Sequence, residues 1–130
     1  MYLLDTNACI HFMRGKYGMH ARVAAVGVGH VAISEITWAE MLFGVEKSEQ
    51  QARNRLALDT FLSDFRVLPI TPAIPIYAKE RARLEAIGKP LDDFDLLIGA
   101  TAIHHGLALV TNNTRHFERL HGIVLEDWTA

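Results

Sequence analysis

Short apolar runs alternate with longer stretches of helical periodicity along the 130-residue chain. The apolar runs are typical of buried strands, and the longer stretches repeat apolar residues every three or four positions. The pattern predicts strands at residues 2–4, 31–33, 67–70, 107–111 and 123–125, and helices at 8–14, 20–26, 34–47, 50–65, 74–87, 94–105 and 115–120. Because parallel strands need helical crossovers, the chain is expected to form an α/β fold. We predict a three-layer α/β/α domain with a central parallel sheet of about five strands.

Composition and charge are those of one ordinary globular domain, expected to span residues 1–130. Half of the residues are hydrophobic and 22% are charged. The single Cys9 suits a reducing compartment, so we expect a cytoplasmic protein. The longest uncharged run, residues 96–114, is too polar in its second half to cross a membrane. A net charge of −2 does not by itself indicate a nucleic-acid binder, so such a function must rest on a site.

Two polar residues follow predicted strands. Asp5 comes directly after the first strand, and Asn113 comes after the strand at residues 107–111. The carboxyl ends of parallel strands are where open sheets bind ligands. Helix capping is the alternative for Asp5, and a turn with a cap is the alternative for Asn113.

Two further carboxylates lie on predicted helices, in stripes expected to face the core. Glu40 shares its stripe with Ile36 and Phe43, and Asp95 shares its stripe with Ile98. Burying a carboxylate is costly unless a cation or hydrogen-bond donors meet it. Glu40 at the edge of its stripe, reaching water or an arginine, is one alternative. For Asp95 the alternative is a place in the first turn of a helix that Asp92 caps.

These four residues together indicate a metal site. Carboxylates gathered in one partly buried place repel one another, and a divalent cation removes that conflict. An all-oxygen set of Asp, Glu and Asn suits Mg²⁺ or Mn²⁺. The natural reaction for such a site is hydrolysis of a phosphodiester. Zinc, nucleophilic serine or cysteine, and P-loop chemistry have no matching motif in the chain.

Four segments carry these residues in a fixed order. They read LLDTN at residues 3–7, IS with AEMLFG at 33–34 and 39–44, GKPL with DLLIGA at 88–91 and 95–100, and VTNNTRHF at 110–117. Together they resemble the VapC-type toxins of the PIN-domain family, over essentially the whole chain. The resemblance implies a metal-dependent endoribonuclease with Mg²⁺, or alternatively Mn²⁺, as its cofactor.

The resemblance also implies roles for individual residues. Asp5 and Asp95 would hold the metal, and Glu40 would bind it as well or position and deprotonate the attacking water. Asn113 would support the metal or a phosphate oxygen. The small hydroxyl residues that match positions close to the site are Thr6, Ser34 and Thr111. His116 stands where many relatives carry an acid, so the number of metals stays open.

Partners follow from the same resemblance. It implies an RNA substrate, with tRNA and in particular initiator tRNA expected, and a VapB-like antitoxin that blocks the site. It also implies a homodimer, and binding to operator DNA only through the antitoxin. Four basic residues are candidates for contacts with the RNA backbone, with solvated surface charge as the alternative: Lys47, Arg53, Lys89 and Arg115. Trp38 and Phe94 are candidates for stacking on bases, with core or interface packing as the alternative.

Two other functions are kept as alternatives. A non-catalytic PIN-fold interaction module would tolerate the neutral Asn113 but has no reason to concentrate carboxylates on core-facing positions. A haloacid-dehalogenase-type phosphotransferase also opens with an apolar strand and an acid. The segment after Asp5 lacks the second acid that such an enzyme needs, which makes this the weaker alternative.

Overall fold

The computed structural model describes all residues, 1–130, and contains five strands and seven helices. None of the helices combines the length and the apolar character that crossing a bilayer requires. In chain order the elements are β1 (Tyr2–Leu4), α1 (Thr6–Met13), α2 (Met19–Val26), β2 (Val31–Ser34), α3 (Glu35–Glu46), α4 (Gln51–Asp64), β3 (Arg66–Leu68), α5 (Ile74–Ala86), α6 (Asp93–His105), β4 (Ala108–Val110), α7 (Thr114–Phe117) and β5 (Val124–Glu126).

The five strands form one parallel sheet in the order β3-β2-β1-β4-β5. In the central register Leu4 pairs with Ile33 on one side and with Val110 on the other. Every neighbouring pair is parallel, which confirms the predicted sheet.

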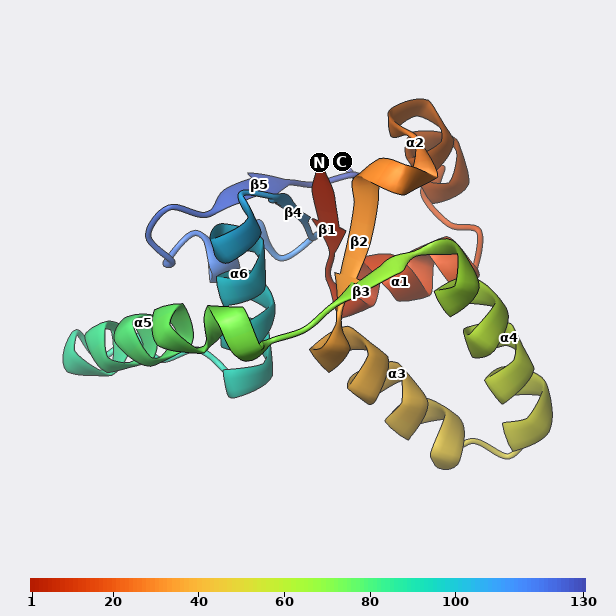
Figure 1. Ribbon diagram of the computed structural model, residues 1–130, viewed down its shortest axis with the longest axis horizontal. Coiled ribbons are helices and arrows are strands. Elements are labelled where there is room, and N and C mark those ends of the chain that lie inside the picture. The colour runs from red at the N-terminus through yellow and green to blue at the C-terminus, as the bar shows by residue number, and fades with distance from the viewer.

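Successive side chains of a strand point to opposite faces, so the sheet has a core on each side. Leu3 packs in a cluster with residues of α5, α6 and α7. Leu4 packs in a second cluster with residues of α1, α2 and α4. Figure 1 shows these two groups of helices on either side of the strands. The predicted three-layer α/β/α arrangement is therefore confirmed, and Cys9 lies fully buried in the second cluster.

Several predicted boundaries were wrong by a few residues. The third strand ends at Leu68 rather than at Ile70, because Ile70 turns into a 3₁₀ turn and its N–H donates to the Glu35 carboxylate at 2.7 Å. The last helix ends at Phe117 rather than at Leu120. The Leu120 N–H donates to the carbonyl of Phe117, three residues earlier, instead of to the residue four positions earlier as in an α-helix. Short elements like these depend on tertiary contacts that periodicity does not register.

Gly99 lets α6 lie close to the segment that follows α7. A methyl group on Gly99 would overlap the side chain of Leu120 and also touch Phe117. This close approach fixes α6, and with it the carboxylate that α6 carries near its first turn.

Candidate active site

The sheet order gathers three polar residues at one edge. Ser34 ends β2, Asp5 follows β1 and Thr111 follows β4, and these three strands are neighbours. From β1 the sheet extends through β2 on one side and through β4 on the other, so the topological switch point lies between β1 and β4. The Asp5 N–H donates to the Val110 carbonyl across that point at 3.1 Å. Ligands of open parallel sheets bind at such a place.

Asp5 is a buried carboxylate with only 5% of its surface exposed. It caps α1 by accepting the Ala8 N–H at 2.8 Å, and it also accepts a hydrogen bond from the Thr111 hydroxyl. Burial raises the pKa of Asp5, and the nearby Asp95 carboxylate raises it further, against the effect of these hydrogen bonds. Capping and proximity to a second acid therefore coexist at this residue.

Asp95 reaches the same edge from the first turn of α6. Asp92 caps that helix by accepting the N–H groups of Phe94 and Asp95, as expected. The neighbours of Asp95 on its stripe, including Ile98, are buried, so the prediction of a core-facing stripe is correct here. Burial is the largest cause that raises the pKa of Asp95, and His116 opposes it.

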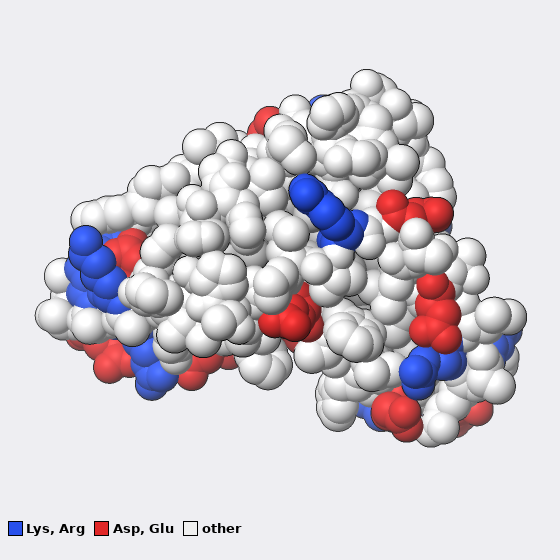
Figure 2. Space-filling model, in the orientation of Figure 1, with Lys and Arg blue, Asp and Glu red and all other residues white.

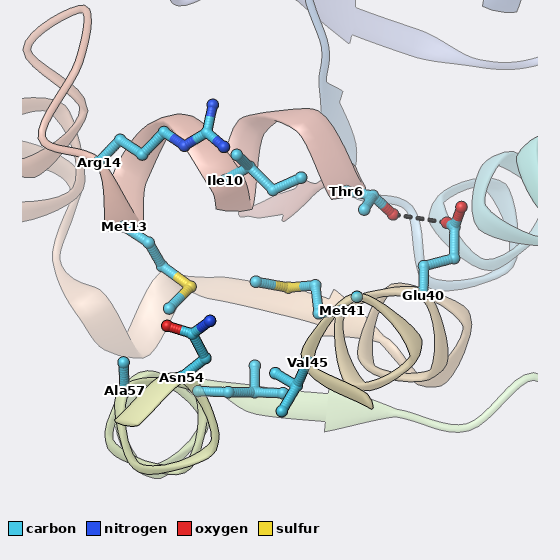
Figure 3. Close-up of a pocket in the computed structure, with 11 residues that line it drawn as sticks. Thr6, Ile10, Met13, Arg14, Glu40, Met41, Val45, Asn54 and Ala57 are labelled. Atoms are coloured by element: carbon cyan, nitrogen blue, oxygen red, sulfur yellow. Dashed lines mark hydrogen bonds between the residues drawn. The ribbon is translucent and has the colours of Figure 1, made fainter. Parts of the chain in front are cut away.

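Glu40 lies on α3, half-buried, where the Thr6 hydroxyl donates to its Oε1 at 2.7 Å. Figure 3 shows this contact at one end of a hollow between α1, α3 and α4. The prediction that the stripe of Glu40 faces the core was half wrong. Ile36 is buried, but Phe43 is 64% exposed, because further along α3 the buried face is the one that carries Val45. The alternative of Glu40 at the edge of its stripe is closer to the structure.

The supporting residues divide into two groups. Thr6 contacts Glu40, and Thr111 contacts Asp5, as just described. Ser34 is fully buried and caps α3 by accepting the Ile36 N–H at 3.0 Å. It therefore holds the helix that carries Glu40.

Asn113 is exposed, and its side chain makes no hydrogen bond to the carboxylates. Its N–H donates to the Thr111 hydroxyl at 3.0 Å, and its carbonyl accepts from His116 and Phe117. The turn that the local sequence suggested is therefore present. No three His, Cys, Asp or Glu side chains stand close enough together to form a ready-made metal cluster.

Sequence reasoning missed one contact at this edge. His116 Nε2 lies 3.1 Å from Asp95 Oδ2, and both side chains are partly exposed. The sequence marked His116 only as a departure from the family pattern, and 21 positions separate it from Asp95. The packing of α7 against α6 brings the two together, and no local spacing signals that.

Trp38 and Phe94 are 42% and 47% exposed, so core packing does not account for them. Phe43 and Phe94 line one surface hollow and together form an exposed aromatic patch, which we define by these two residues. Ala39, Glu40, Phe43 and Phe94 line a largely apolar hollow of about 510 Å³ there. The patch thus adjoins the candidate site at Glu40.

Comparison with known proteins agrees with the fold and identifies the family. A model of the PIN domain family matches residues 2–123. The tRNA(fMet)-specific endonuclease VapC of Shigella flexneri is 36% identical over 98% of both chains. The chain belongs to the VapC group of the PIN-domain family. Ribonuclease VapC2 of Rickettsia felis is another relative of this PIN domain, 35% identical over 98% of both chains.

Solved structures of similar proteins share the fold of this PIN domain. VapBC2 from Rickettsia felis, bound to a DNA fragment from its promoter, matches with a TM-score of 0.91 and 32% identity over 98% of both chains. DNA-bound VapBC from Salmonella typhimurium matches with a TM-score of 0.90 and 36% identity, covering 98% of this chain and 97% of that one.

The donor chemistry of this PIN-domain site fits a hard divalent cation. Asp5 and Asp95 offer carboxylate oxygens, and each has a raised pKa, so each lacks full compensation for its charge. Neither forms an ion pair with a lysine or an arginine. Oxygen donors of this kind are those that Mg²⁺ and Mn²⁺ prefer.

Proposed function

We propose that this chain is a metal-dependent endoribonuclease toxin of the VapC type that cleaves tRNA, with initiator tRNA as the first candidate, and that a VapB-type antitoxin neutralises it. One observation carries the catalytic part: the Asp5 carboxylate is buried at the switch point of the sheet, its pKa is raised by burial and by the charge of Asp95, and it forms no ion pair with a lysine or an arginine. The names of the VapC relatives, which include a tRNA(fMet)-specific endonuclease, support the substrate.

In this proposal Asp5 and Asp95 hold the Mg²⁺ or Mn²⁺. When bound, such a cation supplies electrostatic stabilisation of the negative charge that develops on the phosphate. Glu40 positions the attacking water and accepts its proton, because the Thr6 hydroxyl fixes Oε1 and leaves the second oxygen available. Thr111 holds Asp5 in place through its hydroxyl. Asn113, exposed at the same edge, contacts a phosphate oxygen of the substrate.

Contacts with the RNA backbone come from scattered basic side chains in this proposal. Lys47, Arg53, Lys89 and Arg115 are all exposed, and none forms an ion pair within the chain. On the face that Figure 2 shows, basic and acidic groups are interspersed, without a continuous basic track. We therefore expect the shape of the RNA and the bound cation to contribute much of the selectivity.

The hollow in Figure 3 supports a site for the antitoxin next to the carboxylates. It measures about 320 Å³ and is lined mainly by apolar side chains of α1, α3 and α4, with Glu40 and Thr6 at one end. An amphipathic helix of the antitoxin that fills this hollow also covers Glu40, which blocks the substrate. One similar VapBC complex has been solved with a fragment of its promoter DNA and another with bound DNA, which supports an operator role through the antitoxin.

A homodimer is proposed from the exposed aromatic patch. Phe43 and Phe94 leave an apolar surface beside Glu40, and large aromatic residues are enriched in the centres of protein interfaces. Phe43→Asp places a charge in that surface, and light scattering should then report a monomer where the wild type is a dimer. An unchanged dimer contradicts the use of this patch.

Cleavage of a total tRNA pool tests the function. We expect discrete fragments from the wild type with Mg²⁺ or Mn²⁺, and none with EDTA or with Asp95→Asn. That substitution nearly preserves the shape of the side chain and removes one charge. A well-folded wild type that cleaves no RNA with either ion contradicts the proposal.

A further inference from the structure

Asp95 and His116 form a close pair at the open edge of the site. Among the seven histidines of the chain, His116 is the one whose ring contacts a carboxylate. The two side chains come from α6 and α7, and both remain partly open to solvent, at 35% and 27% exposure. Asp95 in turn lies close enough to Asp5 to raise its pKa. Asp95 and His116 therefore present a carboxylate oxygen and an imidazole nitrogen to each other at this edge, as a pair and without a third such side chain clustered with them.

The spacing within the pair is that of two ligands on one metal ion. Donors that lie about 2.1 Å from an octahedral cation, at right angles to each other, are about 3 Å apart. His116 Nε2 and Asp95 Oδ2 are 3.1 Å apart. The two donor atoms are thus already at the separation that two adjacent ligands of one cation require.

We propose that His116 binds the divalent cation directly through Nε2, together with Asp95, and that this nitrogen donor makes the site prefer Mn²⁺ to Mg²⁺. The inference rests on the metal dependence proposed above and assigns one further ligand of that site. Mg²⁺ favours oxygen donors and gives up its water reluctantly, whereas imidazole nitrogen suits transition-metal ions. A glutamate at this position would restore an all-oxygen site.

The alternative role for His116 is to orient Asp95 by donating an N–H to it. Pulsed EPR of bound Mn²⁺ separates the two roles, because a directly bound imidazole nitrogen modulates the spin echo and a hydrogen-bonded neighbour does not. The test uses the purified chain with Mn²⁺ and compares wild type, His116→Glu and His116→Gln. His104→Gln is the matched control, since His104 is an exposed histidine at the far end of α6.

The same samples give the ratio of the affinities for the two ions. The EPR signal of free Mn²⁺ falls as the protein binds Mn²⁺, and it recovers when added Mg²⁺ displaces the bound ion. We expect the nitrogen modulation in wild type and His104→Gln and its absence in both His116 variants. We also expect His116→Glu to lower the Mn²⁺-to-Mg²⁺ affinity ratio on the order of tenfold. Circular dichroism verifies that the variants are folded.

Two results overturn the inference in different ways. Mn²⁺ bound by the wild type without nitrogen modulation, or with the same affinity ratio in His116→Glu, removes His116 from the ligand set and leaves the proposed ribonuclease intact. No binding of either ion to the folded wild type contradicts the metal dependence of the proposed function itself, and the inference with it.

Discussion

Two carboxylates in this molecule expose equally little of their surface, but their pKa values are shifted in opposite directions. Asp5 and Glu80 are each only 5% exposed. Glu80 on α5 accepts two hydrogen bonds from the Arg83 guanidinium, both at 2.9 Å, and one from the His121 N–H at 2.7 Å. Arg83 is the main cause that lowers the pKa of Glu80. Burial dominates at Asp5 and raises its pKa.

The pKa values of the two residues differ in direction because a basic side chain neutralises the charge of Glu80 and none pairs with Asp5. The chain itself supplies the cation for Glu80, and Arg83 also donates to the Arg119 carbonyl at 2.7 Å, which ties α5 to the segment after α7. No lysine or arginine pairs with Asp5, whose largest interaction with another charge is with the like-charged Asp95. Glu80 thus stabilises the fold, whereas the charge of Asp5 is not neutralised by a basic side chain of the chain.

The largest expected effect is on activity at Asp5. Asp5→Asn keeps an oxygen that can accept the Ala8 N–H, and it removes a carboxylate that would bind the cation. RNA cleavage should fall about a hundredfold or more, while the melting temperature without metal should rise, because a poorly compensated charge is gone. Cleavage rates and thermal melting measured on the same preparation check both parts. An active Asp5→Asn enzyme argues against a catalytic site at this edge.

Glu80→Gln should give the converse result. The loss of the buried charge weakens its hydrogen bonds to Arg83, so the free energy of unfolding should fall by about 2 kcal/mol. Cleavage per folded molecule should stay at the wild-type level. Glu85→Gln on the same helix is the control, because Glu85 pairs with Arg81 in an exposed ion pair of little energetic value. Urea unfolding measures all three proteins, and equal losses for both variants would remove the distinction.

The pH dependence of stability should differ in sign between the two residues. The pKa of Asp5 is raised in the folded protein, so above pH 3.8, its ordinary pKa, native Asp5 binds more protons than unfolded Asp5 does. Its contribution to stability therefore falls as the pH rises from this value through the raised pKa. Glu80, with a lowered pKa, contributes stability above its ordinary value of 4.5 and loses it as the pH falls through the lowered pKa. The free energy of unfolding is measured in EDTA from about pH 3 to pH 7. Relative to wild type, the gain in Asp5→Asn and the loss in Glu80→Gln should both grow as the pH rises. A pH-independent difference for either variant contradicts the assignment.

The smallest effect is expected at Thr111. Thr111→Val keeps the shape of the side chain and removes the hydroxyl that bonds to Asp5 and accepts the Asn113 N–H. The pKa of Asp5 should rise further, and stability should fall by about 1 kcal/mol. Carbon NMR of the Asp5 carboxyl follows the titration. Thr101→Val is the control, because that hydroxyl bonds only to Leu97 within its own helix, and it should leave the Asp5 titration unchanged.

Much of the fold could be predicted from the sequence, because strand and helix periods alternate cleanly and parallel strands require crossovers. Asp5 stood out because it follows a strand directly, and Asp95 because its helix is buried on nearly all sides. The exposure of Phe43 could not be predicted, since Phe43 looks like a core residue in sequence. The contacts of His116 and Glu80 also stayed hidden, because they join segments 21 and 41 positions apart.

The most direct measurement of the central claim is thermal melting of wild type, Asp5→Asn and Glu80→Gln with and without Mg²⁺ or Mn²⁺. A ligand that binds only the folded state raises the melting temperature. We predict a metal-dependent rise for wild type and for Glu80→Gln, and none for Asp5→Asn. A rise of equal size in Asp5→Asn, or no rise in the wild type, would contradict the claim that this edge of the sheet is completed by a cation.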